Sequence, residues 1–172
     1  MTRRVLVYGV TGSGKSTAAA RIAERTGLPL TLVDELTWLP GWVPLEVEAQ
    51  RELFAEIVAG ERWVLDSAYS HWIDLVLART DLVVGLDYPR WLSLSRLVRR
   101  TVRRATDKRP VCNGNTESWR QLLSRDSIVG WHFQSFARKR ARMRAWATDP
   151  TKPEVLLFRR PRDLERWIAT LG

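Results

Sequence analysis

The sequence predicts an α/β fold in which helices cover both faces of a parallel sheet of five strands. Five short apolar runs, each bounded by glycine, proline or charged residues, alternate with longer segments of helical periodicity. The runs are apolar throughout, which is typical of parallel strands buried on both faces. A chain of 172 residues with 45% hydrophobic residues is long enough for one such domain and its core. We therefore expect a single three-layer αβα domain over residues 1–172.

The first half of the chain predicts three of the strands. Residues 5–8 are apolar and run into Gly9, which favours a buried strand. Residues 17–26 are rich in alanine and stop at Gly27, so they are expected to form a helix. The same criteria predict strands at 30–33 and 62–66, helices at 45–59 and 72–78, and a loop with two tryptophans at 38–44.

The second half predicts two more strands and a helical insertion between them. Residues 82–87 form the fourth strand and residues 155–158 the fifth, and a last helix covers 163–171. Between the two strands the sequence predicts a basic helix at 91–104, a loop at 105–118, and a mostly helical stretch at 119–146 with Gly130 as a break. A helix, a polar loop and a helix at this place are expected to form a mobile lid, inserted at about residues 105–130.

Composition excludes several classes of protein. No apolar run approaches the 18 or so residues that a membrane-spanning helix needs. The apolar stretch at residues 5–10 is too short for a signal peptide and runs into glycines and a lysine. The single cysteine, Cys112, permits neither an intrachain disulfide nor a cysteine-rich zinc site. We expect a reduced, cytoplasmic protein with no membrane partner.

The charge of the chain is concentrated in one segment. Residues 90–144 hold fifteen Lys and Arg against three acids, a balance of +12, whereas the rest holds thirteen against sixteen, a balance of −3. Such a segment attracts polyanions, either nucleotide phosphates or nucleic acid. The alternative is a solvated helical face, which we favour for the run Arg138–Arg144. Any nucleic-acid binding is expected to be weak and non-specific.

A phosphate-binding loop follows the first strand. Gly9-Val-Thr-Gly-Ser-Gly-Lys-Ser16 matches the P-loop pattern G-x-x-x-x-G-K-[ST], with a strand before it and a helix after it. The glycines let backbone N–H groups turn inward around a phosphate, and the helix presents its N-terminus to the same anion. The residues predicted to bind ATP are Gly9, Val10, Thr11, Gly12, Ser13, Gly14, Lys15, Ser16 and Thr17. Lys15 is the predicted catalytic cation on the β- and γ-phosphates, and the Ser16 hydroxyl is a predicted Mg²⁺ ligand.

A P-loop needs a second carboxylate near Mg²⁺, on a neighbouring strand. Asp66 ends the third predicted strand and is the favoured candidate. Asp87 ends the fourth and is the alternative, although Tyr88 and Pro89 follow it and it could equally cap the basic helix.

Arginines in the basic helix are candidates for phosphoryl transfer. Arg96 and Arg100 are four residues apart, so they share one helical face. Guanidinium groups suit bidentate phosphate binding and the charge that develops on a transferring phosphoryl group. We predict that both are catalytic.

Several of these motifs together resemble one family. The chain is similar to adenylate kinase-like P-loop kinases, and most similar to the branch of adenylate kinase-related or DNA topology modulation proteins. The segments that carry the resemblance are Gly9–Thr17, Trp38–Trp42, Trp63–Asp66, Leu86–Arg90, Arg96–Arg100 and Cys112–Trp119. The resemblance implies that Asp66 lies near Mg²⁺, that Arg96 and Arg100 bind phosphate, and that the strand order is 2-3-1-4-5.

The acceptor side departs from that family. Nucleoside monophosphate kinases follow the strand-three Asp with Gly-Phe-Pro-Arg, whose Arg holds the acceptor phosphate, but this chain continues Ser67-Ala-Tyr-Ser-His71. Asp34 instead resembles the carboxylate with which small-molecule kinases orient an acceptor hydroxyl. A carboxylate that takes a proton helps an alcohol, whereas an acceptor phosphate is already ionised. We therefore predict a catalytic role for Asp34; a helix cap or a water-mediated Mg²⁺ ligand is the alternative.

The sequence therefore predicts a kinase that uses ATP and Mg²⁺ to phosphorylate a small molecule, with a hydroxyl acceptor favoured over a nucleoside monophosphate. Trp38, Trp42 and His71 are candidate acceptor-binding residues, and Trp72 is a further aromatic that could line the pocket. A nucleic-acid-associated ATPase and an ATP-binding regulator remain the alternatives.

Overall fold

The computed structural model describes residues 2–107, 112–115 and 128–171 and confirms the three-layer α/β architecture. One parallel sheet contains the strands β1 (Arg4–Gly9), β2 (Leu30–Thr31), β5 (Trp63–Leu65), β6 (Leu82–Leu86) and β7 (Glu154–Phe158). Their order is β2-β5-β1-β6-β7, which is the expected 2-3-1-4-5 when the strands of this sheet alone are counted along the chain.

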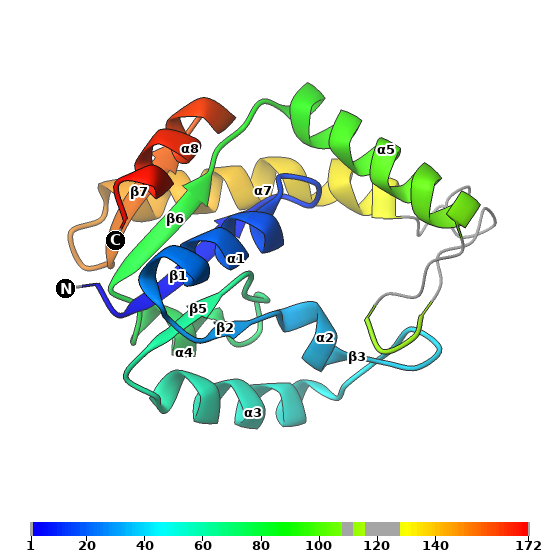
Figure 1. The fold of residues 1–172 in the computed structure, drawn as a ribbon. Coiled ribbons are helices and arrows are strands. Elements are labelled where there is room, and N and C mark those ends of the chain that lie inside the picture. The colour runs from blue at the N-terminus through cyan, green and yellow to red at the C-terminus, as the bar shows by residue number, and fades with distance from the viewer. Residues whose placement is uncertain (1, 108–111, 116–127, 172) are drawn as a thin grey trace.

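Helices cover both faces of this sheet (Figure 1). The helices α1 (Lys15–Thr26) and α8 (Pro161–Ala169) pack on one face, and α3 (Val47–Ala59), α4 (Ile73–Leu77) and α7 (Ile128–Thr148) on the other. Alternation along β1 explains the two cores, because Val5 and Val7 belong to the first and Leu6 and Tyr8 to the second. Burying each such aliphatic side chain stabilises the fold by about 1.5–3 kcal/mol.

The remaining elements lie at the carboxyl ends of the strands. They are the helices α2 (Val33–Thr37) and α5 (Arg90–Asp107), and a two-stranded antiparallel sheet of β3 (Trp38–Leu39) and β4 (Val43–Pro44). Figure 1 shows α5 beside the turn that joins β1 to α1. This end of the sheet is where open α/β folds bind their ligands.

Three local predictions were wrong in detail. The second strand ends at Thr31 rather than residue 33, because α2 begins at Val33. The expected loop at 38–44 is a hairpin, whose turn uses the left-handed conformation at Gly41 (φ +83°) and Trp42 (φ +60°). Gly130 lies inside α7 and does not break it, since a helical glycine costs only about 1 kcal/mol relative to alanine.

The predicted lid lies largely outside the described residues. Helix α5 continues to Asp107 and α7 begins at Ile128, and between them the structure describes only residues 112–115. The boundaries of a lid at about 105–130 therefore stay a prediction.

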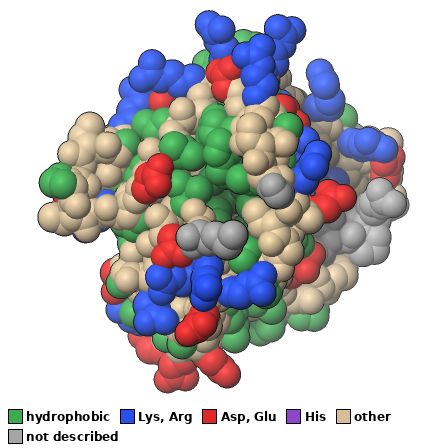
Figure 2. All heavy atoms as spheres, turned by 60° about the vertical axis from the view of Figure 1, so that its left-hand side comes forward, with side chains coloured by type: hydrophobic (Ala, Val, Ile, Leu, Met, Phe, Trp, Pro, Cys, Tyr) green, Lys and Arg blue, Asp and Glu red, His purple; other side chains and the backbone are tan. Residues whose placement is uncertain are grey.

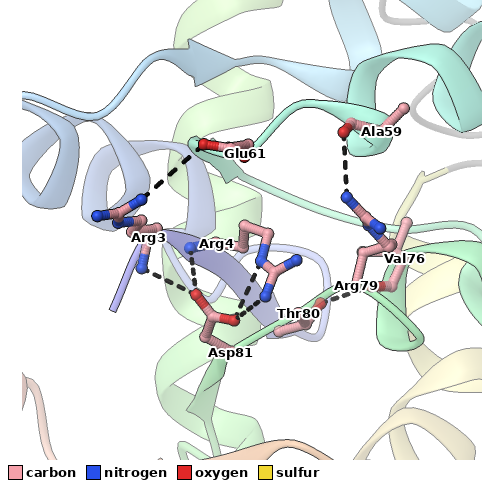
Figure 3. Close-up of polar contacts among 8 residues, drawn as sticks. All are labelled: Arg3, Arg4, Ala59, Glu61, Val76, Arg79, Thr80 and Asp81. Atoms are coloured by element: carbon pink, nitrogen blue, oxygen red, sulfur yellow. Dashed lines mark hydrogen bonds and ion pairs between the residues drawn. The ribbon is translucent and has the colours of Figure 1, made fainter. Parts of the chain in front are cut away.

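An ion pair fastens the amino ends of the central strands (Figure 3). Asp81 Oδ1 accepts hydrogen bonds from Arg4 Nε at 3.0 Å and Nη2 at 2.5 Å, and Oδ2 accepts the backbone N–H groups of Arg3 and Arg4. These contacts join the start of β1 to the start of β6, at the opposite end of the sheet from the P-loop. They have a structural role.

The surface around the chain ends mixes both signs of charge. Figure 2 turns the left-hand side of Figure 1 toward the viewer, and there Lys and Arg alternate with Asp and Glu around a largely hydrophobic centre. Among the described residues, no helix combines the length and apolar character needed to cross a membrane.

Candidate active site

The backbone of the P-loop requires glycine at two positions. Gly12 and Gly14 have φ values of +83° and +91°, which side chains rarely adopt. A Cβ at Gly12 would also come within 2.3 Å of the Ser93 carbonyl oxygen on α5. The loop is closed by Ser13, whose N–H and hydroxyl donate to the Val10 carbonyl at 3.2 and 2.8 Å. Helix α5 therefore packs directly on the outside of the loop.

The start of α1 and Lys15 suit a polyphosphate. No side chain caps α1 at Gly14, so the first N–H groups of the helix keep their capacity to bind an anion. Lys15 Nζ donates to the Val10 carbonyl at 3.1 Å. Burial lowers the pKa of Lys15, and nearby Asp34 and Asp66 oppose that shift. A desolvated ammonium beside free N–H groups fits the phosphates of a nucleotide.

Asp66, rather than Asp87, lies beside Ser16. The Ser16 hydroxyl donates to Asp66 Oδ2 at 2.6 Å, and the Val33 N–H donates to Oδ1 at 2.8 Å. Burial raises the pKa of Asp66, and these two hydrogen bonds oppose the shift. A hydroxyl and a carboxylate at this distance are oxygen donors that Mg²⁺ prefers. The arrangement favours Asp66 as the carboxylate near Mg²⁺.

Asp87 forms ion pairs with arginines of α7 instead. Its side chain is fully buried and receives Arg140 Nε at 2.5 Å and Arg144 Nε at 2.9 Å, with Arg159 Nε at 3.9 Å. The run Arg138–Arg144 is therefore more than a solvated face, because the partly exposed Arg140 and Arg144 also pair with a buried carboxylate. They fix α7 to the end of β6.

Arg96 and Arg100 lie near the P-loop. Arg96 Nη1 donates to the Ser13 carbonyl at 3.3 Å, and its guanidinium lies 5.6 Å from the centroid of the Tyr88 ring. Arg100, one turn further along α5, is close enough to Lys15 to lower the pKa of that lysine. The structure thus brings together Lys15 and the two arginines that the sequence singled out.

Asp34, which the sequence predicts to act on the acceptor, is held by a tyrosine. It is exposed on α2, and its Oδ1 accepts a hydrogen bond from the Tyr69 hydroxyl at 2.6 Å. The Tyr69 oxygen in turn accepts Trp38 Nε1 at 3.2 Å and lies 3.1 Å from Thr37 Oγ1. Burial and the Asp34 carboxylate raise the pKa of Tyr69 well above its usual value, so it stays a hydrogen-bond donor. No hydrogen bond from the described residues reaches Asp34 Oδ2.

Two asparagines connect residues 112–115 to α2 and to the β3–β4 hairpin. Asn113 Nδ2 donates to the carbonyls of Glu35 and Trp38, each at 2.8 Å. Asn115 Oδ1 accepts the Trp42 N–H at 2.8 Å, and its Nδ2 donates to the Leu39 carbonyl at 3.0 Å. The rings of Trp38 and Trp42 meet edge to face at 5.9 Å. The two tryptophans predicted to bind an acceptor therefore lie together, beside Tyr69.

The other two aromatic candidates are placed differently. His71 Nε2 lies 3.1 Å from Gln50 Oε1, a contact that ties the loop before α4 to α3. Trp72 is fully buried, is stacked on Phe54 at 4.0 Å and donates to the same Gln50 oxygen. The hypothesis that Trp72 lines a pocket was therefore wrong, because its ring is part of the core.

Sequence reasoning missed two residues of α7 near the site. His132 is fully buried, and its Nδ1 donates to the Thr11 carbonyl of the P-loop at 2.9 Å. Lys139 is half-buried and lies near Lys15 and Asp34. Their spacing from Phe136, Met143 and Trp146 was a usable signal, because it puts all five on one face of a helix.

Comparison of the sequence with known proteins finds a curated relative of unknown function. No family model matches the chain. The uncharacterized protein YqaC of Bacillus subtilis (strain 168) is 32% identical over 108 residues, which are 60% of this chain and 60% of that protein. The chain thus spans less than two thirds of the curated relative that it matches.

Solved structures of P-loop kinases share the architecture. A gluconokinase from Sinorhizobium meliloti 1021 has a TM-score of 0.57 at 17% identity, with 99% of this chain and 93% of that chain covered. A shikimate kinase from Bacteroides thetaiotaomicron has a TM-score of 0.56 at 18% identity, covering 99% and 96%. A deoxyadenosine kinase from M. mycoides has a TM-score of 0.54 at 13% identity, covering 96% and 95%. The chain has the P-loop kinase fold.

Proposed function

We propose that this protein is a kinase that transfers the γ-phosphoryl group of ATP to a hydroxyl of a small molecule. The observation that carries the proposal is the Asp34 carboxylate, which Tyr69 orients on the acceptor side of the P-loop and which lies close enough to Lys15 to influence its pKa. A nucleotide-binding loop with a proton acceptor beside it is the arrangement that phosphoryl transfer to an alcohol needs. The neighbours of the fold, among them a gluconokinase and a shikimate kinase, support a small-molecule acceptor.

Each side chain of the site has a role in the proposed phosphoryl transfer. The acceptor hydroxyl gives its proton to Asp34 while its oxygen attacks the γ-phosphorus, and the bond from that phosphorus to the β–γ bridging oxygen breaks. The products are a phosphate ester and ADP, and the proton passes from Asp34 to water. Lys15, Arg96 and Arg100 stabilise the negative charge on the transferred group. Mg²⁺, held by Ser16 and Asp66, would neutralise charge on the β- and γ-phosphate oxygens.

Tyr69 and Asp34 favour an alcohol over a nucleotide acceptor. The segment after Asp66 supplies a tyrosine hydroxyl and no arginine, and that hydroxyl is bound to a carboxylate. A phosphate monoester placed here would meet the negative charge of Asp34, which is unfavourable by Coulomb's law. The neutral hydroxyl of an alcohol can instead donate to Asp34 Oδ2.

The basic side chains of α7 give little support to a nucleic-acid partner. Arg140 and Arg144 pair with the buried Asp87, which neutralises part of the positive charge of this helix. The comparisons do not support nucleic-acid binding either. Phosphoryl transfer to a small molecule is thus the function that the site supports best.

Acceptor-dependent release of ADP tests the proposal. A panel of small alcohols, sugars, hydroxy acids and nucleosides is supplied with ATP and Mg²⁺. Asp34→Asn should reduce the acceptor-dependent rate by about 10²–10⁴-fold, the usual contribution of a general base, with the Kd of ATP within twofold of wild type. Glu35→Gln, on the same helix, is the matched control and should leave the rate unchanged. Full transfer by Asp34→Asn would contradict the proposed role.

A further inference from the structure

One face of α7 is mostly buried and carries a single lysine. His132, Phe136, Lys139, Met143 and Trp146 follow one another at intervals of four, three, four and three residues, so they form one seam along the helix. The other four side chains are buried: Met143 and Trp146 belong to the core on this face of the sheet, and His132 contacts the P-loop. Lys139 is the only member of this seam that carries a formal charge at neutral pH.

The contacts of its neighbours fix where Lys139 lies. His132 reaches the Thr11 carbonyl in the P-loop, and the Trp146 ring lies 4.8 Å from the Tyr8 ring near the end of β1. Lys139 leaves the helix between these two contacts, at the carboxyl end of the sheet. Burial and the nearby Lys15 lower its pKa to about 7, and Asp34 opposes the shift, so both residues lie within electrostatic reach of Lys139.

Within the described part of the chain, Lys139 lacks the kind of partner that its neighbours have. Arg140 is paired with Asp87, and Arg138 lies 5.7 Å from the centroid of the Trp131 ring. No hydrogen bond or ion pair joins Lys139 to any residue in the described ranges 2–107, 112–115 and 128–171. A partly desolvated ammonium without an anion is unfavourable, and the binding of an anion would relieve that cost.

The P-loop already has cations beside it. Lys15, Arg96 and the start of α1 all lie at the P-loop. On the acceptor side, α2 and the Tyr69 loop contribute a carboxylate and a phenol, and neither balances an anion. Asp34 influences the pKa of Lys139, so the two side chains lie within electrostatic reach of each other. An acceptor that gives its hydroxyl to Asp34 would place another part of itself against Lys139.

We propose that Lys139 binds an anionic group of the acceptor, so that the acceptor is a small molecule with both a hydroxyl and a carboxylate or phosphate. This inference rests on the proposed kinase function and narrows its substrate class. The ammonium makes a charge-assisted hydrogen bond to the anion, and this bond fixes the hydroxyl against Asp34. A neutral polyol would lose this contact.

Matched acceptors test the inference by kinetics. Gluconate is compared with sorbitol, and glycerate and glycerol 3-phosphate with glycerol, so that the carboxylate and phosphate arms are separate. We expect ADP release with an anionic member and much less with its neutral partner. Lys139→Met should raise the KM of that acceptor by about 10–100-fold, as for one hydrogen bond to a charged group, and change the KM of ATP less than twofold. Lys152→Met, at an exposed lysine, is the control.

Each other outcome has a defined meaning. Neutral acceptors used as well as anionic ones would overturn the inference but keep the proposed function. A loss of kcat in Lys139→Met with an unchanged acceptor KM would also overturn it, since Lys139 would then act on the transferred phosphoryl group. ADP release with no acceptor of the panel would overturn the proposed function itself, and this inference with it.

Chemical labelling gives a readout that needs neither ATP nor turnover. Wild-type protein is acetylated near pH 7 with an N-hydroxysuccinimide ester, and mass spectrometry follows Lys139 with Lys152 as the internal reference. The anionic member of a pair should protect Lys139 at least about fivefold more than its neutral partner, as expected when an anion occupies the amine. Equal labelling with both members would overturn the inference.

Discussion

Removing the Tyr69 hydroxyl tests how the acceptor side is organised. In Tyr69→Phe, Asp34 Oδ1 loses a donor at 2.6 Å, and Trp38 Nε1 loses an acceptor at 3.2 Å. A hydrogen bond to a charged group contributes about 1.5–3 kcal/mol, and the exposure of Asp34 places this one at the lower end. Because 1.4 kcal/mol is a factor of ten, we expect kcat to fall about tenfold. The KM of ATP should stay within twofold, since the P-loop contacts are untouched.

A steady-state assay with varied acceptor and varied ATP separates these effects. Thr37→Val is the matched control, because it removes a hydroxyl 3.1 Å from the same phenol oxygen but keeps the Asp34 hydrogen bond. Thermal unfolding reports whether either variant is destabilised. Wild-type kcat in a folded Tyr69→Phe variant would refute the reasoning that Tyr69 orients Asp34.

Three further predictions concern the P-loop and its support. Lys15→Ala should lower ATP affinity by at least about 100-fold in calorimetric titration without lowering the free energy of unfolding, because Lys15 contributes charge to the phosphates and little to the core. Unchanged affinity in a folded variant would contradict the assignment of the P-loop as the ATP site. Arg96→Ala should lower turnover by about 10²–10³-fold while ATP binding weakens much less, and single-turnover kinetics check this. Burial depresses the pKa of His132 below 6.5, while the Thr11 carbonyl opposes the shift and nearby Arg90 and Lys15 add to it. The unfolded state therefore binds more protons, and the free energy of unfolding should fall as the pH drops below about 6.5. Denaturant titrations at several pH values would show a shallower acid limb in His132→Asn, and an unaltered limb would refute the assignment.

The sequence could predict what is local. The P-loop occupies eight consecutive residues, and its glycines, lysine and hydroxyl are each required by the conformation or charge of that short segment. The five strands are also local signals, because short apolar runs bounded by turn residues favour buried strands. This is why the order of elements and the fold class were predictable before the structure.

Pairings between distant residues could not be read from one sequence. Tyr69 and Asp34 are 35 residues apart, and Arg140 and Asp87 are 53 apart. A run of cations predicts a solvated face equally well whether or not a buried carboxylate lies opposite, and this is why the pairing of Arg140 and Arg144 with Asp87 was not predicted. Asn113 likewise has no local feature that marks its two bonds to α2 and β3.

The measurement that tests the central claim most directly is ³¹P NMR of the protein with ATP, Mg²⁺ and an acceptor that stimulates ADP release. A small-molecule kinase must give a new phosphomonoester resonance that grows mole for mole with ADP, while inorganic phosphate stays at its acceptor-free level. ADP accompanied by an equal amount of inorganic phosphate, with no ester at any acceptor concentration, would show an ATPase and contradict the account.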